Sequence, residues 1–201
     1  MTRVVLASRN AHKIEEMARI LDDAGLRIEV VGIDSFADVP EVAETEASFE
    51  GNALLKARAV CAATGVPAVS DDSGLCVDSL NGMPGVLSAR WSGGAGDMAN
   101  LELVLAQLGD TPDERLGAQF RCAVALVLPD GREAVVHGEM PGRLVRSPRG
   151  ANGFGYDPIF VPYGESRTSA ELSSAEKDAI SHRGNALRAL VPVLRGLLTP
   201  Q

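Results

Sequence analysis

The sequence predicts an α/β protein in which helices pack on a β-sheet. Short runs of β-branched and apolar residues alternate along the chain with stretches whose apolar side chains recur at helical spacing. The 201 residues are 45% hydrophobic and 23% charged, a composition that suits a globular protein with a sizeable core. No internal repeat, low-complexity segment or linker interrupts the pattern. We therefore expect one domain over residues 1–201, with its polar clusters on loops.

The N-terminal segment predicts a strand, a helix and a second strand. A β-branched run at 4–7 is the first strand, and apolar residues at helical spacing over 14–21 predict a helix that ends at Gly25. Residues 28–33 form the second predicted strand. The acidic segment DVPEVAETEAS, residues 38–48, contains a proline and no apolar period, so it predicts a loop.

The next segment predicts a capped helix and a buried strand. Ser48 is a candidate N-cap, and the apolar face that follows it ends before Gly65. Residues 68–70 then enter the sheet. We expect this strand to end where two adjacent carboxylates, Asp71 and Asp72, follow it.

The middle of the chain predicts a helix and a hairpin. Asp97 is a candidate cap for a helix through Leu108. Residues 120–128 and 134–137 flank a PDG turn and together predict a long β-hairpin.

The C-terminal segment predicts one more helix. Ser173 and Glu176 have capping-box spacing at its start. We expect the helix to continue to about Leu190 and to be kinked or interrupted at Pro192, because proline lacks the N–H that a helix needs.

Charge and cysteine usage exclude several classes of protein. A formal net charge of -8 lacks the basic footprint that nucleic acid or an anionic membrane selects. Three scattered cysteines, Cys61, Cys76 and Cys122, do not suit a disulfide framework. The N-terminus has no signal-peptide core, and no apolar run approaches the ~20 residues of a membrane span. We expect a soluble protein of the reducing cytoplasm.

The first polar cluster is ASRNAHK, at a strand-to-helix turn. Backbone N–H groups and the helix dipole favour an anion there, and Ser8, Asn10 and Lys13 add side-chain donors. The Walker sequence is absent from the chain. The alternative is that Asn10 simply caps the helix and Lys13 is solvated.

The second cluster is acidic. Asp71, Asp72 and Ser73 can combine with Glu44 and Glu46 of the acidic loop. Carboxylates and hydroxyls without clustered His or Cys suit Mg²⁺, which would also relieve the repulsion between neighbouring carboxylates. The alternative is a turn at the end of a strand, stabilised by side-chain hydrogen bonds.

The third cluster, GANGFGYDPIF, concentrates aromatic residues in a chain that has few. Glycines let the backbone approach a ligand, and Phe154 can stack on a nucleobase. The alternative is a turn whose Phe154 and Tyr156 anchor the core.

The fourth cluster, EKDAISHRGNA, carries donors that would favour carbonyl oxygens on a base. Lys177 and Arg183 donate but never accept. On one uninterrupted helix Lys177 and His182 would lie about 140° apart. Either the helix breaks near Ser181 or a ligand wraps around it; the alternative is a plain exposed surface.

Together the four clusters supply the parts of a nucleoside triphosphate site, and six motifs in order resemble one family. They are LASRNAHK, FEGNALLKA, DDSGL, PGVLSARWSG, GFGYDPIF and ISHRGNAL. These motifs, spread from about residue 3 to residue 190, resemble those of the inosine triphosphate pyrophosphatase family, the HAM1-like or non-canonical purine NTP pyrophosphatases (dITP/XTP pyrophosphatases).

The resemblance implies a fold and a reaction. The implied fold is an ITPase/Maf-like α/β fold: an elongated mixed β-sheet flanked by helices, in two lobes with the active-site cleft between them, assembled as a homodimer. The implied reaction is Mg²⁺-dependent hydrolysis of ITP, dITP or XTP to the nucleoside monophosphate and pyrophosphate, which cleanses the nucleotide pool of deaminated purines.

The resemblance also implies residue roles. Asp72 would be a metal ligand and the general base, Ser73 a substrate contact and Glu44 the second metal ligand, with Glu46 as the alternative to Glu44. The implied triphosphate contacts are Ser8, Arg9, Asn10, Ala11, His12, Lys13 and Lys56. The implied base contacts are Phe154, Gly155, Tyr156, Asp157, Lys177, His182 and Arg183.

The chain departs from the family at position 51. The family often has E-E-N-A where this chain has Glu50, Gly51, Asn52 and Ala53. If the missing carboxylate supports the metal, we expect either weaker Mg²⁺ binding or replacement of that carboxylate by Glu50. Two other functions stay open: a pyrophosphatase for other modified nucleotides, such as methylated pyrimidine triphosphates, and a nucleotide-binding protein without catalysis.

Overall fold

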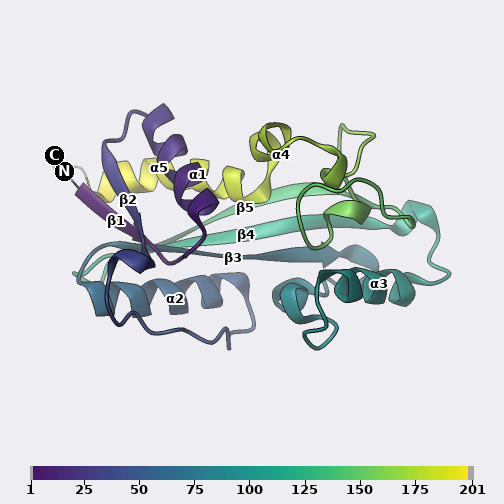
Figure 1. The fold of residues 1–201 in the computed structure, drawn as a ribbon, viewed down its shortest axis with the longest axis horizontal. Helices are drawn as coiled ribbons and strands as arrows, with labels where there is room; N and C mark the ends of the chain where they lie inside the picture. The colour runs from purple at the N-terminus through teal and green to yellow at the C-terminus, as the bar shows by residue number, and fades with distance from the viewer. Residues whose placement is uncertain (1, 199–201) are drawn as a thin grey trace. The chain divides into compact units, whose positions relative to one another are not determined.

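The computed structural model describes residues 2–198 and contains a mixed six-stranded sheet of order β2-β1-β3-β4-β5-β6 (Figure 1). The strands are β1 Thr2–Leu6, β2 Ile28–Gly32, β3 Ala68–Val77, β4 Gly117–Val127, β5 Glu133–Leu144 and β6 Phe160–Pro162. β1 is parallel to β2 and β3, whereas β5 and β6 are antiparallel. The predicted α/β class with a mixed sheet is confirmed.

Five α-helices pack on these strands in the described part of the chain. They are α1 Ala11–Asp23, α2 Phe49–Thr64, α3 Asp97–Leu108, α4 Ser174–Ile180 and α5 His182–Leu198. Both predicted ends of α2 form where expected: Ser48 accepts from the Gly51 N–H, and Gly65 ends α2 in the left-handed region. No helix of the described residues is long and apolar enough to cross a membrane.

The chain forms two compact units. The first comprises residues up to Asp72, Cys122–Gly138 and the residues from Arg183 on. The second comprises Ser73–Arg121 and Glu139–His182. Strands β3, β4 and β5 each contribute residues to both units.

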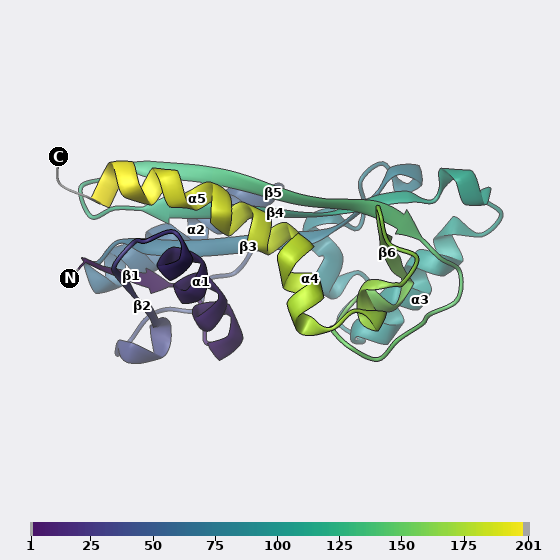
Figure 2. The same ribbon diagram turned by 90° about the horizontal axis from the view of Figure 1, so that it is seen from above.

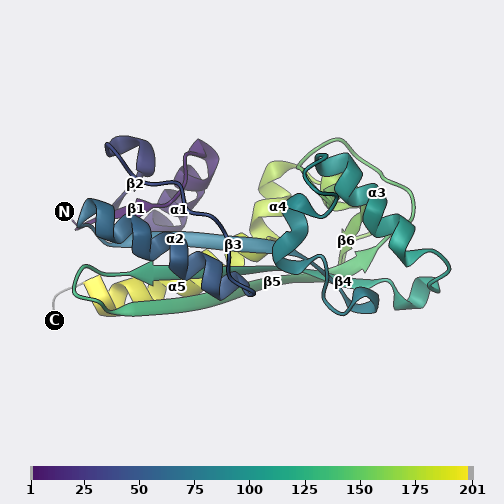
Figure 3. The same cartoon turned by 90° about the horizontal axis from the view of Figure 1, so that it is seen from below.

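In the first unit, helices cover both faces of the strands. α1 and α5 lie on the near side in Figure 2, and α2 lies on the opposite side, which faces the viewer in Figure 3. Leu6, Met17 and Leu190 belong to the core under α1 and α5, whereas Ala57 and Ala123 belong to the core under α2. The part of β3 in this unit, residues 68–72, is therefore buried on both faces of the sheet.

In the second unit, the core forms around the parts of β3, β4 and β5 that belong to this unit. Leu75, Leu101, Phe120 and Phe160 pack together there. The rings of Phe120 and Phe160 meet edge to face with centroids 4.8 Å apart. This core supports the loop that carries the GFGYDP motif, because Tyr156 is part of it.

Two predictions about element ends are wrong. β3 does not end before Asp71 but continues through both carboxylates to Val77. Asp97 is the first residue of α3 rather than its cap; Gly96 occupies the cap position without a side-chain hydrogen bond. In both places the carboxylate is bound by a partner distant in sequence, which local patterns do not reveal.

The C-terminal helical segment is divided. Ser173 and Glu176 form the predicted capping box, but the chain leaves the helical conformation at Ser181, so the single helix predicted to continue to about Leu190 is wrong. Of the two alternatives for Lys177 and His182, the helix break near Ser181 is confirmed. An interruption at Pro192, one of the two predicted outcomes, is wrong, because α5 continues through it to Leu198; a kink there stays a prediction. One missing hydrogen bond is outweighed here by the burial of Leu190 and Leu194 in the core.

Candidate active site

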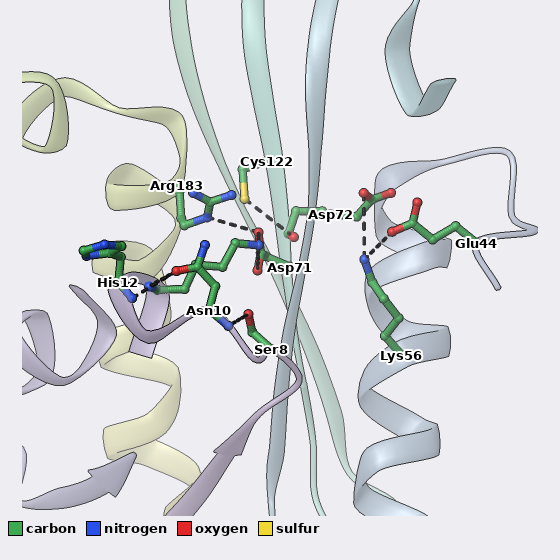
Figure 4. Close-up of polar contacts among 11 residues, drawn as sticks. Ser8, Asn10, His12, Glu44, Lys56, Asp71, Asp72, Cys122 and Arg183 are labelled. Carbon is green, nitrogen blue, oxygen red and sulfur yellow. Dashed lines mark hydrogen bonds and ion pairs between the residues drawn. The ribbon is translucent and has the colours of Figure 1, made fainter. Parts of the chain in front are cut away.

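The adjacent carboxylates Asp71 and Asp72 point to opposite faces of β3. Side chains alternate along a strand, and Figure 4 shows Asp71 directed toward Arg183 and Asp72 directed toward Lys56. The strand therefore separates the two charges, and each carboxylate has its own cations. The expectation that both carboxylates serve one metal has no geometric support, since their partners lie on different helices.

Asp71 is the centre of a buried ion-pair network in the first unit. Lys13 Nζ lies 3.0 and 3.1 Å from its two carboxylate oxygens, and Arg183 Nε lies 3.1 Å from Oδ2. Burial raises the pKa of Asp71, but the charges of Arg183 and Lys13 outweigh burial and hold this pKa well below its usual range. Asp71 is therefore ionised, and its network fixes α1 and α5 to β3.

The turn before α1 is built by short polar contacts. Asn10 caps α1, since its side chain accepts from the N–H groups of His12 and Lys13. Ser8 Oγ accepts from the Asn10 N–H at 3.1 Å. Arg9 forms an exposed pair with Asp34 at 3.0 Å. The capping role of Asn10 is confirmed, while Lys13 is held by Asp71 rather than merely solvated.

Asp72 faces α2 and is held by an amide. Asn52 Nδ2 donates to Asp72 Oδ2 at 2.9 Å, and Lys56 Nζ lies 3.9 Å from Asp72 Oδ1. Lys56 also donates to Glu44 Oε1 at 2.7 Å. The carboxylates of Asp72 and Glu44 thus approach the same ammonium group from two sides.

This donor set suits Mg²⁺ only together with a substrate. Within residues 2–198 there is no group of three or more His, Cys, Asp or Glu side chains arranged to hold a metal. Asp72 and Glu44 supply two carboxylates around one position that a cation, Lys56, already approaches. Mg²⁺ commonly binds through one or two carboxylates and completes its shell with phosphate oxygens and water.

Glu50 does not replace the carboxylate that the family often has at position 51. Its side chain pairs with His137 of β5 at 2.8 Å. On α2 it lies about 200° around the helix from Asn52, the residue that faces Asp72. The replacement that the sequence suggested is therefore wrong.

The second unit holds a pocket of about 120 Å³ at the GFGYDP motif. Its lining includes Ser73, Gly74, Ser88, Asp97, Phe120, Phe154, Gly155, Tyr156, Asp157, Lys177 and His182. Most of the base contacts that the resemblance implies are thus gathered in one place, together with Ser73. Arg183 is not among the described residues that line this pocket. Its guanidinium is bound to Asp71 in the first unit.

Phe154 is presented to solvent by a buried ion pair. Phe154 is 67% exposed, and Lys177 Nζ lies 5.0 Å from the centroid of its ring. Asp157, which is buried, accepts from the Phe154 N–H and pairs with Lys177. Gly153 has φ +75°, and a Cβ there would lie 2.1 Å from Asp157 Oδ2, so a side chain at this position would break the arrangement.

Tyr156 and His182 form the rigid part of the pocket. The Tyr156 hydroxyl donates to the Ser88 carbonyl at 2.8 Å, and burial raises the pKa of Tyr156. The His182 ring stacks on Phe120 with centroids 5.1 Å apart. The alternative in which Phe154 and Tyr156 both anchor the core is therefore right for Tyr156 and wrong for Phe154.

Sequence reasoning missed two residues that position others. Asn52 holds Asp72, and Asp97 accepts from the Gly155 N–H at 2.8 Å. Asn52 lies four residues before Lys56, so the two share one helix face. That spacing could have predicted that Asn52 faces the site beside Lys56. No local sequence pattern connects Asp97 with Gly155, which lies 58 residues away.

Comparison with known proteins gives one family. The model of the Ham1 family matches residues 4–193. A dITP/XTP pyrophosphatase of Streptomyces coelicolor is 60% identical over 98% of this chain and 100% of its own length. A dITP/XTP pyrophosphatase of Mycobacterium tuberculosis H37Rv is 57% identical over 99% of this chain and 98% of its own length.

Solved structures agree. The crystal structure of a nucleoside-triphosphatase, or dITP/XTP pyrophosphatase, from Mycobacterium abscessus has 56% identity and a TM-score of 0.81, covering 96% of this chain and 100% of its own. A HAM1 protein from Coxiella burnetii has 43% identity and a TM-score of 0.90, covering 98% of this chain and 100% of its own. On the family model, the identities and the shared fold, this chain belongs to the Ham1 family.

Proposed function

We propose that this chain hydrolyses dITP, XTP and ITP to the nucleoside monophosphate and pyrophosphate, with Mg²⁺ as cofactor. Relatives named dITP/XTP pyrophosphatase at 57–60% identity identify it as a nucleoside triphosphate pyrophosphatase, a hydrolase. The observation that carries the finer proposal is the buried Asp72, fixed by Asn52 and set beside the Lys56–Glu44 pair. The proposed role of the activity is removal of deaminated purines from the nucleotide pool.

In the first unit, Asp72 and Glu44 would hold Mg²⁺, and Lys56, on the same face of β3, would contact phosphate oxygens. Lys13 pairs with Asp71 on the other face. When bound, Mg²⁺ supplies positive charge that neutralises the phosphates. Asp72 orients a water molecule and takes its proton as the water oxygen bonds to the α-phosphorus. The bond from that phosphorus to the bridging oxygen breaks, and Lys56 stabilises the departing pyrophosphate.

In the second unit, the base would stack on Phe154 beside Lys177. An ammonium group donates hydrogen bonds and never accepts them. The carbonyl at C6 of hypoxanthine or xanthine is therefore accepted, while the amino group of adenine faces another donor and is rejected. Because His182 is held in place by Phe120, its ring can serve as a fixed wall of the same pocket.

Product analysis tests the proposal. Phosphorus NMR after incubation with Mg²⁺ and dITP, XTP, GTP or ATP should show pyrophosphate from dITP and XTP, with ATP at least about tenfold slower. GTP shares the C6 carbonyl, so its rate tests whether the 2-amino group of guanine is rejected. Orthophosphate with a diphosphate product would refute attack at the α-phosphorus. Faster turnover of methylated pyrimidine triphosphates would indicate a different substrate class. Absence of turnover both with Mg²⁺ and with EDTA would indicate binding without catalysis.

Replacing Phe154 by Ala is expected to raise KM for dITP about 5- to 150-fold with a smaller change in kcat. Stacking on an aromatic ring contributes ~1–3 kcal/mol per base, and a contact made equally in the ground and transition states appears in KM. Tyr163→Ala is the matched control, because Tyr163 is 66% exposed in the same unit and does not line the pocket. Equal KM values for Phe154→Ala and Tyr163→Ala would remove Phe154 from base binding.

Homodimer formation, which the resemblance implies, is also proposed. Light scattering coupled to size exclusion at several concentrations tests it directly, and a mass of 21.1 kDa at all of them would refute it.

A further inference from the structure

The acidic loop before α2 is tied to Asp72 through one buried amide. The Asn52 side chain is fully buried; its Oδ1 accepts from the Glu46 N–H at 2.9 Å and its Nδ2 donates to Asp72 Oδ2 at 2.9 Å. The same side chain therefore binds the loop backbone and a carboxylate of the proposed metal site. Two residues before Glu46 in this loop, Glu44 binds Lys56 of the same helix.

The loop also rests directly on Gly51. A Cβ at position 51 would lie 2.6 Å from Glu46 Cβ and 2.9 Å from Glu46 Cγ, closer than such atoms approach in proteins. The backbone of Gly51 cannot easily move away, because its N–H donates to the Ser48 cap at 3.1 Å. The absence of a side chain at 51 is thus what lets Glu46 lie against α2.

We propose that Gly51 and Asn52 form a seat for the acidic loop and act as positioning residues for Glu44. Here the seat means the contacts of Gly51 and Asn52 with Glu46. Because the seat fixes Glu46, it fixes Glu44 beside Lys56 and hence near Asp72. The metal part of this inference rests on the proposed function; the loop contact does not.

The seat also explains the departure at position 51. In this chain, the Cβ and Cγ of Glu46 occupy the position that a side chain at residue 51 would take. A larger residue at 51 would occupy that position itself. A Gly51→Ala substitution would push Glu46 outward, break its hydrogen bond to Asn52 and displace Glu44. Asp72 would keep its place in β3.

The test follows the Glu46 amide by NMR hydrogen exchange in the full chain. Its protection factor should fall at least tenfold in Gly51→Ala and in Asn52→Ala. Gly196→Ala is the matched control, since Gly196 also lies in a helix but a Cβ there meets nothing within 4 Å. Unchanged Glu46 protection in Gly51→Ala would overturn the seat.

Rescue separates the steric contact from other effects. Adding Glu46→Gly to Gly51→Ala removes the Cβ that causes the overlap and should restore the Glu44 position, whereas adding Glu46→Ala keeps that Cβ and should not. The readout is the Mg²⁺ concentration for half-maximal activity, which should rise at least fivefold in Gly51→Ala and return toward the wild-type value only with Glu46→Gly. Equal rescue by both would overturn the steric argument.

The two proposals can fail separately. Lost Glu46 protection with an unchanged Mg²⁺ requirement would overturn the positioning role and leave the proposed function intact. A wild-type chain that releases no pyrophosphate would overturn the proposed function, while the exchange measurement would still decide whether the seat exists.

Discussion

An Asp72→Asn variant is expected to remain folded and to lose at least about a thousandfold in kcat. Asn has the shape of Asp, and its amide oxygen can still accept the hydrogen bond from Asn52. Lys56 keeps its partner Glu44, so the substitution leaves no unpaired buried cation. What is lost is the negative charge that would take the proton of water and help to hold Mg²⁺, and a positioned base alone contributes about 10²–10⁴-fold.

The measurement is kcat for dITP at saturating Mg²⁺, with the unfolding midpoint recorded for the same sample. Asp113→Asn is the matched control, because Asp113 forms one exposed pair with Arg146 in the second unit. It should leave both quantities close to wild type. A kcat within tenfold of wild type for Asp72→Asn would show that Asp72 is not the base.

Local sequence signals predicted most of the secondary structure. The helical spacing before Gly25, the Ser48 cap and the PDG hairpin each depend on residues within a few positions of one another, and each is present in the structure. The end of β3 could not be predicted from such local signals. Asp71 resembles a turn residue, yet its partners Lys13 and Arg183 lie 58 and 112 positions away.

The site shows the same limit. The motifs predicted candidate residues, and the structure places Phe154, Asp157 and Lys177 around one pocket. The motifs could not reveal which partner each residue has. Arg183 follows His182 directly in sequence, but its guanidinium binds Asp71 while His182 stacks on Phe120. The helix break at Ser181 gives His182 and Arg183 different surroundings from those expected on one continuous helix.

Replacing Asp71 by Asn is expected to lower the free energy of unfolding by about 3 kcal/mol near pH 7. Removing one partner of a buried ion pair costs about 3–5 kcal/mol, because the remaining charge is left uncompensated. Here two cations, Lys13 and Arg183, depend on the one carboxylate, and both are largely buried. The retained amide oxygen can accept one hydrogen bond, which places the expected loss at the lower end of this range.

The stability difference between wild type and Asp71→Asn should depend on pH in one direction. Because the folded-state pKa of Asp71 is lowered below the unfolded value, the carboxylate stabilises the folded protein above about pH 4, and this contribution is lost as pH falls further. Urea unfolding at pH 7, 5, 4 and 3 should therefore show a constant difference down to about pH 5 and a shrinking one below it.

A surface pair provides the control for this experiment. Glu29 pairs with Arg3 in the same unit, but both side chains are exposed, so Glu29→Gln should change the free energy of unfolding by less than about 1 kcal/mol at every pH. Asp71→Asn should exceed that change several-fold. A difference of similar size for the two variants, or one that stays constant down to pH 3, would mean that the Asp71 network does not hold α1 and α5 to β3.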